Sequence, residues 1–124
     1  MIFIKIRVKG YLKNITDNEI FEFENKGIRN NNKIIYSYDD VKNTIKINDG
    51  EIMLIREGND FINTFVFREK KSSCNYFLKE NNYDVDIDIN TILMNVFDNS
   101  ILIKYEIIDS KCEYEFKIEM SEII

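Results

Sequence analysis

The stretch CEYEFKIEM, residues 112–120, alternates apolar and charged side chains at every position. Successive side chains of a β-strand point to opposite faces, so a period of two separates a buried face from a solvated one. The stretch therefore predicts a strand that lies half-buried on a core. Its apolar face would hold Cys112, Tyr114, Phe116, Ile118 and Met120.

The same period recurs along most of the chain, most clearly in residues 2–9, 84–89 and 101–107. Short polar breaks separate these segments, and Asp49-Gly50 between two apolar runs is a strong signal of a two-residue hairpin turn with positive φ at both residues. Consecutive hairpins that share one apolar face predict an all-β fold, a small antiparallel up-and-down barrel of about eight to ten strands, with a sandwich as the alternative. Residues 90–97 are the one segment where we expect a helical turn.

Charges on the outward faces favour closure of the barrel. The first segment carries Lys5, Arg7 and Lys9, whereas the second and the last carry glutamates. Opposite charges on neighbouring strands stabilise their pairing, and pairing of the last strand with the first would remove both sheet edges. The acidic positions are Glu22, Glu24, Glu113, Glu115 and Glu119.

Length and composition indicate one globular domain over residues 1–124, because 44% of the residues are hydrophobic and 31% are charged. Lys5 and Arg7 interrupt the apolar run that a signal peptide needs, and no stretch approaches the roughly 18 apolar residues of a membrane span. The net charge of −5 argues against a nucleic-acid partner. We therefore expect a cytoplasmic protein without a nucleic-acid or membrane partner.

The residues that are missing also constrain the chemistry. The chain has no His, which excludes Ser-His-Asp and Cys-His catalysis and imidazole ligands for a metal. Asp84, Asp86 and Asp88 form the one conspicuous acidic row, but Ile89 and Asn95 occupy the positions where an EF-hand loop needs Gly and Glu. We interpret the row as a solvated outer face, and we predict no catalytic residue, metal or cofactor. An enzyme is the less favoured class.

The chain also lacks Trp, Pro, Ala and Gln, while Ile and Asn are very frequent. This bias is typical of an A/T-rich bacterial genome and explains the many Asn residues without a functional role. The cysteines Cys74 and Cys112 lack the spacing of a metal site and are too few for a disulfide framework, which fits a cytoplasmic protein.

Arg56 is the main candidate site residue. It ends an apolar strand in register with Ile52 and Leu54, so it would reach the barrel interior if that face points inward. An interior Arg beside tyrosines can hold a carboxylate or phosphate while apolar walls take a tail. The alternative is an Arg at the rim or one paired with a buried carboxylate. The candidate partners are Tyr36, Tyr38, Tyr76 and Tyr105.

Bulky aromatic residues argue against a wide lumen. In a barrel this small, interior aromatic side chains can fill the space completely. The residues that we assign to the core on this basis are Phe21, Phe23, Phe61, Phe65, Phe67 and Phe116.

Three segments resemble the YwiB-like family, a group of bacterial proteins with a calycin-type (lipocalin-like) β-barrel. They are KIIYSYDD (residues 33–40), DGEIMLIREG (49–58) and ILIKYEI (101–107), similar to the family's Tyr-x-Ser-Tyr strand, its hairpin ending in Arg-x-Gly and its late Tyr-bearing strand. The resemblance implies a lipocalin-like barrel over nearly the whole chain and carries no activity.

Two functions follow as expectations. The first is a non-enzymatic barrel that binds a small amphipathic or anionic ligand through Arg56 and the tyrosines. The second is a protein-interaction or structural module that acts through its outer surface, including as a homodimer. It is favoured by residues 51–56 and 61–67, which are apolar on both faces.

Overall fold

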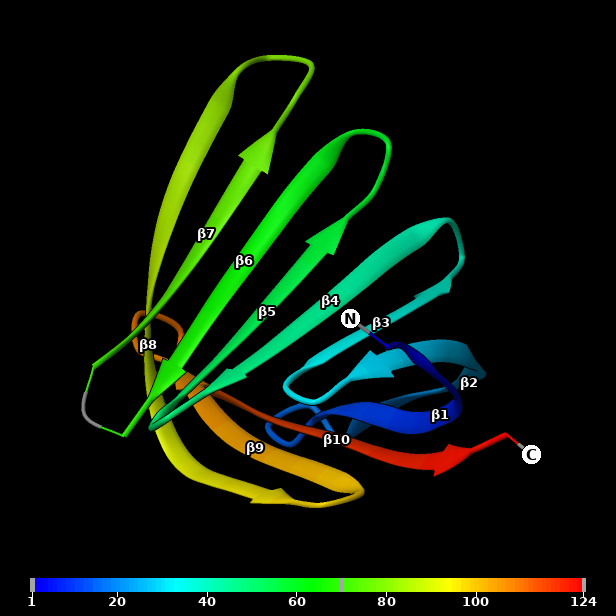
Figure 1. The fold of residues 1–124 in the computed structure, drawn as a ribbon. Helices are drawn as coiled ribbons and strands as arrows, with labels where there is room; N and C mark the ends of the chain where they lie inside the picture. Colours follow the sequence, from blue (N-terminus) through cyan, green and yellow to red (C-terminus); the bar gives the residue numbers. More distant parts are fainter. Residues whose placement is uncertain (1, 70, 124) are drawn as a thin grey trace.

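The computed structural model describes residues 2–69 and 71–123, and Met1, Lys70 and Ile124 lie outside the described residues. Ten strands follow one another, and each pairs antiparallel with its neighbours in the chain (Figure 1). β1 also pairs with β10, so the sheet is a closed up-and-down barrel rather than a sandwich, as the sequence predicts. The strands are β1 (Ile4–Asn14), β2 (Glu19–Asn30), β3 (Lys33–Tyr38), β4 (Val41–Asn48), β5 (Glu51–Glu57), β6 (Phe61–Arg68), β7 (Ser72–Leu78), β8 (Tyr83–Phe97), β9 (Ser100–Ile107) and β10 (Cys112–Glu122).

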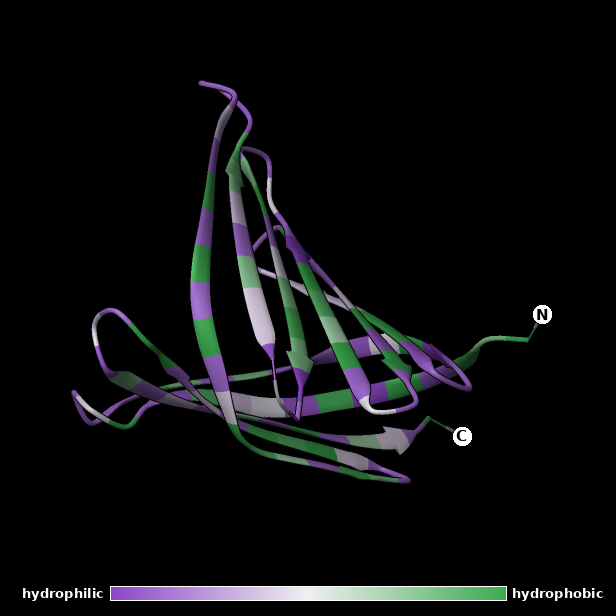
Figure 2. Cartoon of the chain, turned by 90° about the vertical axis from the view of Figure 1, so that its left-hand side faces the viewer, coloured by the Kyte–Doolittle hydropathy of each residue, from purple (hydrophilic) through white to green (hydrophobic). Residues whose placement is uncertain are grey.

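The barrel is flattened into two layers that cross steeply. Strands β4 to β7 lie side by side in one layer, β9, β10, β1 and β2 form the other, and β8 curves from the first layer into the second (Figures 1 and 2). Glycines permit close approach of strands in the second layer. A Cβ atom at Gly10 would collide with the Lys117 carbonyl oxygen, and one at Gly27 would lie 2.6 Å from the Ile35 carbonyl oxygen.

β8 corrects the expected helical turn at residues 90–97. The segment is continuous strand with a bulge between Thr91 and Leu93, after which Met94 pairs with Ile103. The extra residue, Ile92, lets this strand of 15 residues bend between the layers. Among residues 2–69 and 71–123, no helix is long and apolar enough to cross a membrane.

The core is built from the inward-facing side chains of all ten strands. Alternating hydropathy along the strands is visible in Figure 2. Phe23, Phe67 and Phe116 are buried as predicted, and Phe65 packs against the core. Phe21 differs from the prediction, since it is 46% exposed at the end of β2 that reaches the barrel rim.

The hairpin turns are only partly as expected. Asp49-Gly50 does connect β4 to β5, because Asn48 pairs with Glu51, but only Gly50 of the two has positive φ, at 73°. The turn with two left-handed residues is instead Asp39-Asp40 between β3 and β4, with φ of 50° and 61°. Asp and Asn tolerate this conformation better than other non-Gly residues, which is how a chain without Pro makes its turns.

Charges line the seam where the barrel closes, as the sequence predicts. Lys9 of β1 lies opposite Glu24 of β2 and Glu119 of β10, and Lys13 lies opposite Glu115. Arg7 Nη1 forms an ion pair with Glu24 Oε1 at 3.4 Å. Opposite-charge pairs of this kind contribute a few tenths of a kcal/mol each, up to about 1 kcal/mol.

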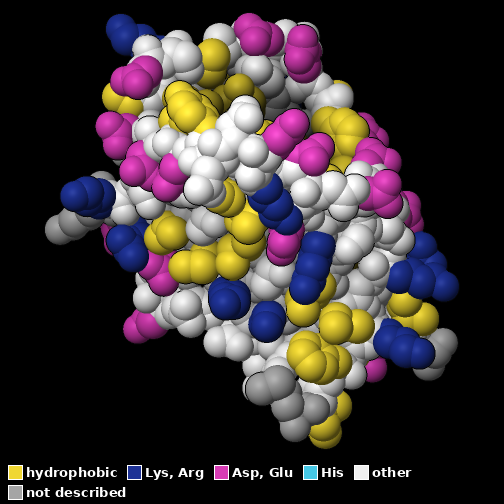
Figure 3. Space-filling model, turned by 90° about the horizontal axis from the view of Figure 1, so that it is seen from above, with side chains coloured by type: hydrophobic (Ala, Val, Ile, Leu, Met, Phe, Trp, Pro, Cys, Tyr) yellow, Lys and Arg dark blue, Asp and Glu magenta, His cyan; other side chains and the backbone are white. Residues whose placement is uncertain are grey.

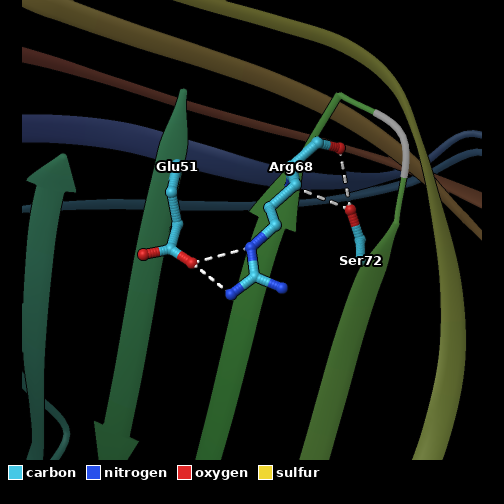
Figure 4. A network of polar contacts seen from close by, with 3 residues as sticks. All are labelled: Glu51, Arg68 and Ser72. Carbon is cyan, nitrogen blue, oxygen red and sulfur yellow. Dashed lines mark hydrogen bonds and ion pairs between the residues drawn. The ribbon is translucent and has the colours of Figure 1, made fainter. Parts of the chain in front are cut away.

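A polar network ties the ends of β5, β6 and β7 together (Figure 4). Arg68 donates to Glu51 Oε1 from Nε at 2.8 Å, and Nη2 lies 2.6 Å from the same oxygen. The Ser72 hydroxyl accepts from the Arg68 backbone N–H at 2.9 Å and donates to its carbonyl at 3.0 Å. Arg68 therefore has its own carboxylate partner on the outer surface.

Candidate functional site

A row of polar side chains crosses five neighbouring strands at one level of the barrel interior. Each member pairs in register with the next, from Tyr36 on β3 to Tyr76 on β7. The next level inward is apolar, because Ile45, Leu54 and Phe65 follow one another there. The polar row therefore marks one end of the barrel, here called the mouth. It consists of Tyr36, Asn43, Arg56, Asn63 and Tyr76.

A small cavity lies below the mouth. Its volume is about 40 Å³. A cavity needs about 10–15 Å³ to hold one water molecule, so the space has room for a few small groups but not for a long ligand tail. Buried apolar side chains pack around the cavity. The lining residues are Leu12, Phe23, Tyr36, Tyr38, Asn43, Leu54, Arg56, Phe65, Phe67, Tyr105 and Phe116.

Arg56 faces this cavity from the end of β5 and is only partly buried, so it stands between the interior and solvent. The residues that the structure describes form four ion pairs, and none of them involves Arg56. The guanidinium thus lies among tyrosines and amides, with no ion-pair partner in the part of the chain that the structure describes. A guanidinium prefers bidentate contact with a carboxylate or phosphate, so this arrangement suits an external anion.

The tyrosines around Arg56 keep their protons well into the alkaline range. Burial raises the pKa of Tyr36, Tyr38 and Tyr105, and in all three the positive charge of Arg56 acts in the opposite, lowering direction. Hydroxyls with raised pKa remain hydrogen-bond donors at neutral pH. The mouth therefore presents a fixed positive charge beside neutral donors, a combination that favours anions.

Two buried asparagines complete the polar row, and the sequence analysis missed them. Asn43, which is 2% exposed, donates from Nδ2 to the Val41 carbonyl at 3.3 Å. Asn63 accepts through Oδ1 from the Cys74 thiol at 3.2 Å. Burial, followed by the negative charge of Asp86, raises the pKa of Cys74 to about 11, so this thiol is protonated at neutral pH.

The structure brings four of the five predicted site residues together. Tyr36, Tyr38, Arg56 and Tyr105 line the cavity, whereas Tyr76 does not. Tyr76 belongs to the polar row, but its ring stacks on Phe61 with centroids 5.8 Å apart.

Stacked aromatic rings form one wall of the mouth. Phe23 stacks on Tyr36 and Tyr38 with centroid distances of 5.5 and 4.8 Å. Phe21 continues the group outward, 5.6 Å from Tyr38, and reaches solvent at the rim. The wall therefore leads from the surface down to Arg56.

The acidic row of β8 lies elsewhere. Asp84, Asp86 and Asp88 are exposed on the outer face, as the sequence predicts, and Asn75 donates to Asp86 at 2.8 Å. Within residues 2–69 and 71–123, no group of three or more His, Cys, Asp or Glu is placed to hold a metal ion.

Comparison with known proteins identifies the family. The family model described as Domain of unknown function (DUF1934) matches residues 6–120, nearly the whole barrel. The chain belongs to the DUF1934 family. Among solved structures, the ywiB protein from Bacillus subtilis is similar in fold, with a TM-score of 0.68, 18% identity, and coverage of 98% of this chain and 92% of that one. No protein with a curated description matches this DUF1934 sequence significantly.

These matches confirm the YwiB-like resemblance drawn from the sequence. At 18% identity, the likeness to ywiB extends to the fold alone. The DUF1934 description names no activity, so the function has to be argued from the mouth itself.

Proposed function

We propose that this DUF1934 barrel is a non-enzymatic binder of a small organic anion, whose acidic group contacts Arg56 at the mouth. The observation that carries the proposal is Arg56 itself. Its partly buried guanidinium lines the cavity and has no ion-pair partner among the described residues. The four ion pairs of the described residues all lie outside the mouth.

The size of the cavity narrows the ligand class. About 40 Å³ suits a small acidic group such as a carboxylate better than the long tail of an amphipathic ligand. The remainder of the ligand would rest at the rim, where Phe21 is 46% exposed beside Tyr38. Aromatic rings prefer stacked or tilted contacts with one another. A small aromatic carboxylate fits both parts of this site.

Titration of isotopically labelled protein with benzoate, followed by NMR, tests the proposal. Benzoate should shift amide signals of residues around the mouth, and neutral benzamide should shift them far less, because only the carboxylate pairs with Arg56. Arg56→Gln should weaken benzoate binding by roughly tenfold or more, as expected for a hydrogen bond to a charged group.

Arg68→Gln is the matched control, since it removes an Arg that already has Glu51 as its partner. This variant should bind benzoate as the unmodified protein does. Equal benzoate affinity of the Arg56→Gln variant and the unmodified protein would reject the proposal, and so would the absence of any signal shift at the mouth in the unmodified protein.

A further inference from the structure

The outer face of β3 to β8 has an ordered distribution of charge that is separate from the mouth. Lysines lie on β3 and β4, apolar side chains on β5 to β7, and the acidic row on β8. Met53 and Ile55 point outward, because Ile52 and Leu54 of the same strand are buried in the core. The partly exposed residues of this apolar band are Met53, Ile55, Ile62, Val66 and Phe77.

Register shows that one row of this face crosses all three zones. In one row Lys33 pairs with Lys46, Lys46 with Met53, and Met53 with Val66. The row continues from Val66 through Ser73 to Asp88. This row therefore runs from positive through apolar to negative, with about 5 Å between neighbouring strands. The next row has Ile35 and Thr44 in place of the lysines and ends at Asp86.

The charges within the band are neutralised, whereas those at its flanks are not. Glu51 pairs with Arg68 and Glu57 with Lys79, both between strands of the band. Among residues 2–69 and 71–123, no ion pair involves the flanking lysines or the acidic row. The space-filling view in Figure 3, seen from above, shows most acidic side chains in its upper part, most basic ones in its middle and lower parts, and exposed apolar side chains between them. The flanking lysines are Lys33, Lys42 and Lys46.

We infer that two copies of this chain associate through the outer face of β3 to β8, about a two-fold axis that runs parallel to the strands between β5 and β6. This axis places the apolar band of one copy on the same band of the other. It also places β3 of each copy opposite β8 of its partner, so Lys33 faces the partner's Asp88. In this row the surface is complementary to itself, as a two-fold interface requires.

The size of the face supports participation of the charged flanks. The apolar band spans three strands of seven or eight residues, β5 to β7, and measures about 15 Å by 25 Å, on the order of 350 Å² in projection. A stable interface buries about 800 Å² of each partner. The apolar band alone is too small, and the lysines and aspartates beside it supply the remaining contact.

Analytical ultracentrifugation of the full chain over a concentration series tests the inference. The unmodified protein should sediment as a dimer that dissociates on dilution. Ile55→Lys, in the middle of the band, should raise the dissociation constant at least tenfold. Leu102→Lys is the matched control, because Leu102 is a partly exposed residue on the outer face of β9, outside the band. The control should remain a dimer.

A charge exchange tests the orientation. Lys33→Glu alone and Asp88→Lys alone should each weaken the dimer, because each places like charges opposite one another, and the double variant should restore it. A circular dichroism spectrum of each variant should be recorded to check that the variant is folded. A monomer at all concentrations up to the solubility limit would overturn the inference, as would a double variant weaker than both single ones. Neither outcome affects benzoate binding at the mouth, which uses the opposite side of the strands.

Discussion

Tyr36 connects the candidate site to the stability of the fold at the scale of a single residue. It is 3% exposed, it lines the cavity, and it stacks on Phe23. Burial raises its pKa above the usual value of 10.0. Folding therefore favours the protonated hydroxyl. This contribution to stability is fully present below the unfolded-state pKa and is lost as the pH rises through the folded-state pKa.

The free energy of unfolding should consequently fall above about pH 10, by up to ~1.4 kcal/mol per pH unit for each fully buried tyrosine. Tyr36→Phe should make this fall less steep, because one hydroxyl with a raised pKa is removed. Urea unfolding at several alkaline pH values measures the slope. Tyr83→Phe is the control, since Tyr83 is 57% exposed. Identical slopes for the two variants would show that the raised pKa of Tyr36 does not contribute to the loss of stability at alkaline pH.

Individual site residues also show which parts of the site could be predicted from the sequence. The inward direction of Arg56 could be predicted because it shares the parity of Ile52 and Leu54 on one strand. Asn43 and Asn63 could not be found in the same way. They join Arg56 only through the register of β4 and β6, which depends on pairing between strands rather than on the pattern along one of them.

At the scale of elements, the strands were predictable because one face of each is buried and the period of two records that directly. The bulge in β8 was not predictable, and its geometry explains why a helical turn was wrongly predicted there. Ile92 is the extra residue of the bulge, so apolar side chains before and after it fall out of phase. Ile92, Leu93, Val96 and Phe97 then imitate a helical spacing.

The turn between β3 and β4 provides a test at this scale. Asp40 is held at φ of 61°, in the left-handed region where glycine has no steric penalty. Asp40→Gly should therefore raise the free energy of unfolding by about 0.5–1 kcal/mol, as measured by chemical denaturation.

Gly50→Ala is the converse variant. A Cβ atom there meets nothing within 4 Å, so its φ of +73° is the one source of strain. This variant should be destabilised by about 1 kcal/mol. If Asp40→Gly were destabilising, or if Gly50→Ala were neutral, steric strain at positive φ would not be what determines the stability of these turns.

For the whole molecule, closure is the decisive property. β1 and β10 pair over nine positions, from Ile6 opposite Glu122 to Asn14 opposite Tyr114. Beyond the Ile6–Glu122 pair, the Ile123 N–H donates to the Lys5 carbonyl at 3.0 Å. The two ends of the described chain are therefore neighbours, which is a favourable geometry for joining them.

A circular permutant that links these ends through a short Gly-Ser segment and opens the chain at Asp49-Gly50 should fold into the same barrel. The new ends would lie in a turn, so no strand pairing is lost. Cooperative urea unfolding and an unchanged circular dichroism spectrum would confirm this expectation. A permutant opened between Leu102 and Ile103 is the control and should fail, because it cuts β9 between paired strands. Equal folding of both permutants would show that closure is less important than proposed.

The seam between β1 and β10 also matters while the protein is being made. Of the ten strands, β1 leaves the ribosome first, and β10, which completes its pairing, leaves last. Until then the nascent chain presents unpaired N–H and C=O groups along an isoleucine-rich strand, a template for strands of other nascent chains. The yield of folded protein should therefore depend on chaperones that shield extended apolar segments during synthesis.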